Sequence, residues 1–304
     1  MTDPDDIAPP TPAPARAALP WIVLGAIGLA WGGTGPLAKL TVSTGNHPIG
    51  ISFWTAAIAA GLYTAALALT VRRVPLGRRY LVFFLICGLL GTALPSALSY
   101  TGYQHLPVGV MSLLIALVPM ATLLLALPLG IEPPEPRRLA GVALGAAAVA
   151  LIVLPETSLP DPSQAVWVAL PVIVTLSYAG ENIYIAAARP PGLSTLTVMC
   201  GLSWGALALL TPLTLATGAW VEISRLDGPE IAIVATSVLH VGAYFGFVWL
   251  IGHAGPVFAA QVAYVVTGSG VAFGMVFYGE RPSPWIWGAL VLMFAGLALI
   301  KPRQ

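Results

Sequence analysis

Glu181 is the residue of this sequence with the clearest chemical potential, because it is an acid inside a run of apolar residues. Tyr178 lies one helical turn before it, and Asn182 directly follows it. A charge placed in hydrocarbon costs about 2.5 kcal/mol or more, so acids in such runs usually face a cavity or a proton pathway. We therefore expect Glu181 to contact a substrate or to carry a proton. The alternative is a hydrogen bond to a neighbouring helix near the end of its span.

His240 is a second titratable candidate, since it lies near the middle of another apolar run with Tyr244 one turn further on. It would either change its charge during function or stay neutral and bond a backbone carbonyl. The four histidines are scattered along the chain, without the close His or Cys spacing that zinc sites use. We expect no metal, no cofactor and no enzymatic activity.

Aromatic and hydroxyl side chains share helical faces in several other apolar runs. Ser96, Ser99, Tyr100 and Tyr103 fall on one face, because residues three and four apart are neighbours on a helix. Such faces are typical of a mostly apolar cavity with a few orienting donors; the alternative is a belt of tryptophan and tyrosine at the membrane interface. The residues expected to bind a substrate are Trp31, Thr34, Ser96, Tyr100, Tyr103, Tyr178, Glu181, Asn182, Trp204, His240, Tyr244, Gln261 and Tyr264.

Composition indicates that these apolar runs cross a membrane. The chain is 58% hydrophobic and 8% charged, against about 25% charged in soluble domains. A bilayer-spanning helix needs about 20 mostly apolar residues. The sequence therefore predicts an all-α membrane protein with ten transmembrane helices, over residues 20–41, 48–71, 80–103, 107–130, 137–155, 164–188, 192–218, 230–252, 256–279 and 284–300.

The distribution of lysine and arginine predicts that both termini are cytoplasmic, since short cytoplasmic loops carry an excess of these residues. With ten spans, one side of the membrane collects Arg16, Arg72, Arg73, Arg78, Arg79, Arg137, Arg138, Arg189, Lys301 and Arg303. The other side collects Lys39, Arg225 and Arg281. Residues 1–18 are rich in proline, alanine and aspartate and are expected to form a disordered tail.

Two stretches of the chain repeat one pattern. Pro107 opens an apolar run that ends at Glu132, and Pro256 opens a similar run that ends at Glu280. Residues 19–155 and 164–304 are therefore expected to form two five-helix repeats. Because five is an odd number of spans, the two repeats would enter the membrane in opposite senses, as in many transporters.

These residues resemble the drug/metabolite transporter superfamily, specifically its EamA-type members with ten helices in two five-helix halves. The matching features are the pair Trp31-Gly32, the segment YTGYQHLPVGVMSLLIALVPMATLLLA that leads to Glu132, and the echo from Tyr264 through Glu280 to Gly288. The sequence departs from the family at Gly268, which stands where the second half would repeat Pro119. A familiar substrate is therefore not assumed.

The resemblance implies a secondary transporter of the inner (cytoplasmic) cell membrane that exports a small metabolite, amino-acid-like or otherwise, by alternating access. Coupling to protons through Glu181 or His240 is one hypothesis. The expected partners are a small-molecule substrate, membrane lipid and protons, with no nucleic acid. We expect a monomer, although glycine pairs such as Gly28 and Gly32 leave a dimer as the alternative. Two other functions stay open: efflux of lipophilic cations or drugs, and a non-transporting membrane receptor or scaffold.

Overall fold

The structure is a computed structural model that consists of helices and connecting loops. It describes residues 14–70, 74–223, 227–254, 256–259 and 261–300. The helices are α1 (Pro14–Ser43), α2 (Pro48–Ala68), α3 (Arg78–Gly88), the π-helix η1 (Leu89–Ala93), α4 (Leu94–His105), α5 (Val108–Ile115), α6 (Val118–Ala126), α7 (Pro136–Val153), the 3₁₀-helix η2 (Pro162–Val168), α8 (Ala169–Ala188), α9 (Thr195–Thr217), α10 (Gly228–Ala254), α11 (Pro256–Ala259), α12 (Val262–Tyr278) and α13 (Pro284–Leu299). Over these residues the predicted all-α class is confirmed.

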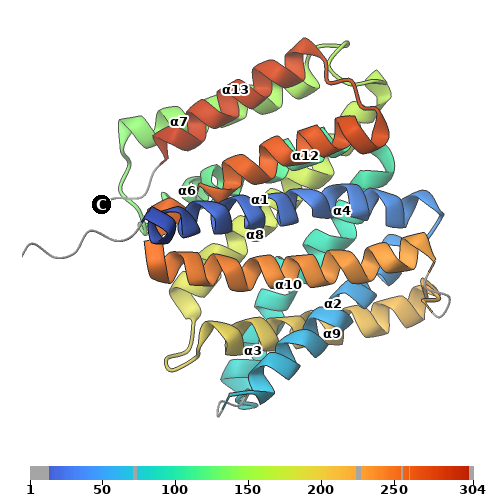
Figure 1. Ribbon diagram of the computed structural model, residues 1–304, viewed down its shortest axis with the longest axis vertical. Helices are drawn as coiled ribbons and strands as arrows, with labels where there is room; N and C mark the ends of the chain where they lie inside the picture. The colour runs from blue at the N-terminus through green and yellow to red at the C-terminus, as the bar shows by residue number, and fades with distance from the viewer. Residues whose placement is uncertain (1–13, 71–73, 224–226, 255, 260, 301–304) are drawn as a thin grey trace, which may run out of the picture.

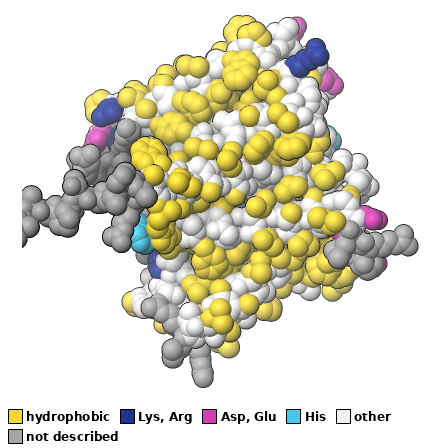
Figure 2. All heavy atoms as spheres, viewed as in Figure 1, with side chains coloured by type: hydrophobic (Ala, Val, Ile, Leu, Met, Phe, Trp, Pro, Cys, Tyr) yellow, Lys and Arg dark blue, Asp and Glu magenta, His cyan; other side chains and the backbone are white. Residues whose placement is uncertain are grey.

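Each predicted span coincides with one helix or with a series of consecutive helices. In the described chain, 8 segments are long and apolar enough to cross a membrane, and α12 and α13 are apolar but shorter. Figure 2 shows hydrophobic side chains spread over one whole face of the protein, with the charged side chains of that face near its edges. Such a surface suits lipid rather than water, and the protein is a multi-pass membrane protein.

Prolines divide two of the predicted spans. Proline lacks an amide hydrogen, and its ring clashes with the carbonyl four residues earlier. Pro119 therefore separates α5 from α6, and Pro95 follows the π-helix η1, whose wider turn accommodates it. The predicted span 256–279 is also divided, into α11 and α12, next to residue 260, which lies outside the described residues.

The N-terminal end differs from the expectation of a tail over residues 1–18. Helix α1 begins at Pro14, and proline is favoured in the first turn of a helix because its fixed backbone angle is already helical. Residues 1–13 lie outside the described residues, as do Arg72, Arg73, Arg225, Lys301 and Arg303, which entered the prediction of orientation.

Helix α1 lies in the middle of the bundle, between α10 and α12 (Figure 1). One edge of the bundle is formed by α7 packed on α13, and the opposite edge by α2 and α3 packed on α9. In the remaining part α8 packs against α4 and α6, and α5 packs against α12. Helices from the two halves of the sequence are thus interleaved.

Small residues allow α1 and α12 to approach closely. A Cβ atom at Gly28 would overlap the side chain of Val265, and one at Gly32 would overlap the hydroxyl group of Ser269. That hydroxyl donates a 2.6 Å hydrogen bond to the carbonyl of Val265, so it is held in place. The glycine pair is therefore used for packing within one chain, as small-xxx-small pairs in membranes commonly are.

Gly32→Ala is expected to destabilise the folded protein by about 1–3 kcal/mol, the usual cost of overpacking a tight contact. Gly25→Ala in the same helix is the matched control, because a Cβ there meets nothing within 4 Å. Both changes improve helix propensity equally. A thermal melt in detergent should show a lower Tm for Gly32→Ala and an unchanged or higher Tm for Gly25→Ala; equal values would contradict this packing.

Candidate functional site

A cavity of about 600 Å³ lies between helices of the two sequence halves. Its walls come from α1, α4, α5 and α6 of the first half and from α8, α10, α11 and α12 of the second. The lining residues are Trp31, Thr34, Gly35, Ala38, Ser96, Ser99, Tyr100, Tyr103, Ser112, Ile115, Ala116, Val118, Pro119, Tyr178, Asn182, Thr236, His240, Phe247, Ala259, Val262, Ala263 and Val266. A cavity of this volume is in the range of sites that bind small molecules.

Helical spacing brings the lining side chains of α4 to one wall. Ser96, Ser99, Tyr100 and Tyr103 recur at steps of three and four residues and all reach the cavity. Their hydroxyl groups give this wall several donors and acceptors among apolar neighbours. The structure thus brings together a set that the sequence had placed on one helical face.

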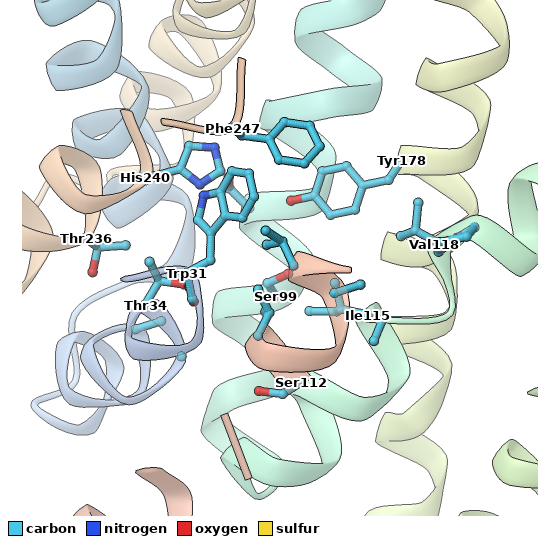
Figure 3. Close-up of a pocket in the computed structure, with 18 of the residues that line it drawn as sticks. Trp31, Thr34, Ser99, Ser112, Ile115, Val118, Tyr178, Thr236, His240 and Phe247 are labelled. Carbon is cyan, nitrogen blue, oxygen red and sulfur yellow. The ribbon is translucent and has the colours of Figure 1, made fainter. Parts of the chain in front are cut away.

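The facing wall is formed by α1 and α10. Helix α10 presents Thr236, His240 and Phe247 along one face, and α1 presents Trp31. The Trp31 ring lies 6.1 Å from that of His240 and 5.5 Å from that of Phe247, between centroids. Figure 3 shows Tyr178 of α8 reaching toward these rings from across the cavity.

Two polar atoms on this wall have no partner. The indole Nε1 of Trp31 and the hydroxyl of Thr236 are buried and make no hydrogen bond with the described chain. Neither imidazole nitrogen of His240 bonds a described residue either. Leaving a buried donor unsatisfied costs about 1–3 kcal/mol, so these groups would gain stability from a hydrogen-bond partner.

The lining carries no aspartate, glutamate, lysine or arginine in the described chain. Its ring, hydroxyl and amide groups can form hydrogen bonds and aromatic contacts, whereas His240 is the only lining side chain able to gain a charge near neutral pH. The cavity is therefore suited to binding and orienting a molecule.

At one end of the cavity region, Glu280 of the second sequence half forms bonds to residues of the first half. Its carboxylate accepts hydrogen bonds from the amides of Val108 at 2.6 Å and Gly109 at 3.1 Å, and it pairs with the Lys39 ammonium at 3.0 Å. These amides open α5, where the helix dipole favours negative charge. We call Lys39, Val108, Gly109 and Glu280 the Glu280 cluster.

The Glu280 cluster is largely shielded from solvent, because the Lys39 and Glu280 side chains are only 25% and 11% exposed. Tyr278 adds a further contact at this end by donating a 2.8 Å hydrogen bond to the carbonyl of Pro36. Lys39, which the sequence placed near the outer end of its span, therefore neutralises an acid of the opposite half.

Glu132, the counterpart of Glu280 in the sequence repeat, is bonded differently. It forms a 2.7 Å pair with Arg138 of its own half, and its side chain is 40% exposed. The Arg138 side chain is only 11% exposed, so the pair is partly shielded from solvent. The two counterpart acids thus differ in their partners. Glu280 bonds residues of the opposite half, whereas Glu132 bonds a neighbour in its own half.

The cavity contains many of the residues expected to bind substrate but not all of them. Those that line it are Trp31, Thr34, Ser96, Tyr100, Tyr103, Tyr178, Asn182 and His240. Those that do not are Glu181, Trp204, Tyr244, Gln261 and Tyr264. The residues of the second group lie in predicted membrane spans, but their side chains are not on the faces that line the cavity.

Glu181 lies next to the cavity, on the same helix as Tyr178 and Asn182, but its carboxyl group turns toward the π-helix η1. A Cβ atom at Gly91 would overlap this carboxyl group. Next to it, Ser177 donates a 2.7 Å hydrogen bond to the carbonyl of Leu90, also in η1. The acid forms no ion pair within the described chain.

The other displaced residues pack elsewhere. Trp204 donates a 2.9 Å hydrogen bond to Thr64 beside a separate apolar groove between α2, α3 and α9. The Tyr244 ring packs near the Tyr63 ring, with 6.4 Å between the ring centroids. The Tyr264 ring packs on the Phe294 ring, with 5.3 Å between the centroids. Gln261 directly precedes α12.

Sequence reasoning missed Ser112, Thr236 and Phe247 as lining residues. Thr236 and Phe247 lie four residues before and seven after His240, which are helical steps onto the same face. Their helical spacing from His240 could therefore have identified both as lining residues. Ser112 lacks such a guide, since its exposure to the cavity depends on how α5 packs against α12.

Comparisons with known proteins agree with this geometry. Residues 18–154 match the EamA-like transporter family. A curated protein of Streptantibioticus cattleyicolor, described as a "Probable terminal-alkyne amino-acid exporter", is 28% identical over 255 residues, which cover 80% of this chain and 82% of that protein.

A solved crystal structure shares the fold, with a TM-score of 0.62 over 93% of this chain and 96% of its own at 19% identity. The helical bundle and the apolar lipid-facing surface agree with this match. The first half of the chain is thus similar to the EamA-like transporter family, a branch of the drug/metabolite transporter superfamily.

Proposed function

We propose that the protein is a secondary transporter that moves a small metabolite through the central cavity by alternating access. The observation that carries this proposal is a cavity walled by helices of both halves, with the Glu280 cluster joining the halves at one end. A transporter needs a central site and two alternative closures. In this proposal the Glu280 cluster forms one of these closures.

The proposed architecture is ten transmembrane helices in two inverted repeats, residues 19–155 and 164–304. Helix packing supports it. Helix α1 packs on α10 and α12, while α8, its counterpart, packs on α4 and α6. Counterpart helices also pack on each other, as α2 on α9 and α7 on α13. A two-fold relation between the halves would produce these pairings.

The proposed orientation places both termini in the cytoplasm of a cell membrane. Arg78, Arg79, Arg137, Arg138 and Arg189 then lie at the cytoplasmic end, and the Glu280 cluster lies at the outer end. In this orientation the Glu280 cluster would close the outer end of the cavity, and the substrate would enter from the cytoplasm. An exporter would load its substrate in such a state.

The proposed substrate is an amino-acid-like small metabolite, by similarity to the relative that is described as an amino-acid exporter. Efflux of lipophilic cations is less well supported, because the described lining holds no carboxylate to attract a cation. Proton coupling through Glu181 is part of the proposal. It would use a carboxyl group beside the cavity rather than one that touches the substrate.

Flux through liposomes tests the proposal and separates it from a receptor or scaffold. The purified full-length protein should exchange labelled L-propargylglycine, an α-amino acid with a terminal alkyne, saturably and faster than empty liposomes do. Ser99→Trp, which fills the cavity, is the matched inactive control. Binding of the amino acid without any flux would contradict transport and favour a receptor.

A further inference from the structure

The wall formed by Trp31 and His240 carries nitrogen groups that make no hydrogen bond within the described chain. Trp31 Nε1 is a donor and cannot accept a hydrogen bond, and it has no partner although it is buried. The imidazole of His240 lies against the same indole ring and is also unpartnered within the described chain. Figure 3 shows the nitrogen-bearing edge of Trp31 turned toward His240.

Both side chains can donate a hydrogen bond, so together they favour a ligand group that accepts hydrogen bonds. A neutral imidazole offers one N–H group, and the indole offers another, so a group with two acceptor oxygens can use both. Hydrogen bonds to an ionised acceptor are roughly twice as strong as those to a neutral one. A carboxylate therefore fits this corner better than an ester, an amide or a hydroxyl group.

The rest of the cavity determines what else the ligand carries. Phe247, Ile115, Val118 and Pro119 offer apolar contact, which suits a short hydrocarbon tail. An ammonium group would meet only aromatic rings and neutral oxygens, since the described lining contains no acidic side chain. Glu181, the acid nearest in sequence to the lining residues Tyr178 and Asn182, is directed toward η1 instead.

We propose that the substrates are small monocarboxylates with an apolar tail, that Trp31 and His240 bind the carboxylate, and that an α-amino group is tolerated rather than required. The proposal rests on the proposed transport function and specifies the ligand of the same cavity. It assigns Trp31 the role of a specificity-determining donor that is satisfied only when ligand is bound.

Three probes measured by calorimetry on the purified full-length protein separate the contributions of the two polar groups. They are L-propargylglycine, its methyl ester, and pent-4-ynoic acid, which lacks the amino group. We expect the two acids to bind within about threefold of each other. The ester should bind about tenfold more weakly, since it loses charge-assisted hydrogen bonds.

Trp31→Phe keeps an aromatic ring on the side of Phe247 and removes the N–H group together with part of the indole ring. It should weaken both acids about tenfold and leave the ester unchanged. The Tm of the unbound protein should fall less than in Trp204→Phe, because the donor deleted at Trp31 had no partner and both variants lose the same ring atoms. Trp204→Phe is the matched control: it deletes a bonded N–H at 2.9 Å from Thr64, so it should lower the Tm and leave all three affinities unchanged.

The inference is overturned if wild type binds acid and ester equally, or if Trp31→Phe weakens acid and ester alike. It is also overturned if pent-4-ynoic acid fails to bind while propargylglycine binds, because the amino group would then be required. In each of these cases flux of propargylglycine through liposomes would leave the transport proposal standing. Absence of both binding and flux would remove the two together.

Discussion

Glu280→Gln is expected to lower transport at least tenfold while the protein stays folded. The neutral glutamine side chain no longer offsets the positive charge of Lys39. With a single oxygen, it also cannot accept the hydrogen bonds from the Val108 and Gly109 amides in the way that the two carboxylate oxygens do. Breaking a shielded ion pair by removing one partner costs about 3–5 kcal/mol when it is fully buried, and somewhat less for this partly exposed pair. A loss of about 2 kcal/mol shifts a two-state equilibrium roughly thirtyfold, here away from the closure of the outer end.

Liposome flux and a thermal melt measure this effect. Glu156→Gln is the matched control, because Glu156 is an exposed acid in the loop that follows α7. This substitution should leave both flux and Tm unchanged. Lys39→Met should have a smaller effect than Glu280→Gln, since Glu280 keeps its two amide donors in that variant. Flux at the wild-type rate in Glu280→Gln would mean that the cluster does not control a step of transport.

Glu181→Gln is expected to abolish proton-driven accumulation of substrate and to preserve exchange within about twofold, because exchange requires no net proton movement. The substitution is nearly isosteric, so packing against Gly91 and η1 should persist. The π-helix itself is a feature often found at functional sites. Accumulation under an imposed pH gradient and counterflow without a gradient are the two measurements.

Glu222→Gln, in a loop and exposed, serves as the control for the loss of one carboxylate. Three results distinguish the possible roles of Glu181. Loss of accumulation alone supports proton carriage. Loss of both activities would indicate a role in the shape of η1 or in substrate contact, and wild-type behaviour in both assays would contradict coupling through this residue.

The positions of the helices could be predicted closely from the sequence, because apolar runs bounded by prolines and charges determine where a chain can cross a bilayer. The interruptions within them were harder to predict. Pro95 and Pro119 both indicate a break, but whether a helix responds with a π-turn at Leu89–Ala93 or with a gap before Val118 depends on neighbouring helices.

The site was only partly predictable, for a related reason. Helical spacing shows which residues share a face, as with Ser96, Ser99, Tyr100 and Tyr103, but it does not show which face meets the cavity. Tyr264 and Glu181 illustrate this difference: one packs on Phe294 and the other on η1. The Glu280 cluster is also invisible in the sequence, since Lys39 and Glu280 are brought together by packing between the two halves.

Side-specific labelling of Ser99→Cys tests alternating access most directly. Ser99 lines the cavity, and the native Cys87 and Cys200 are buried and can be replaced by alanine. We predict that a membrane-impermeant maleimide reacts from the cytoplasmic side at rest, and from the outer side when Glu280→Gln is added. Labelling from the same single side in both proteins, or from both sides at rest, would contradict a cavity that opens alternately to the two sides.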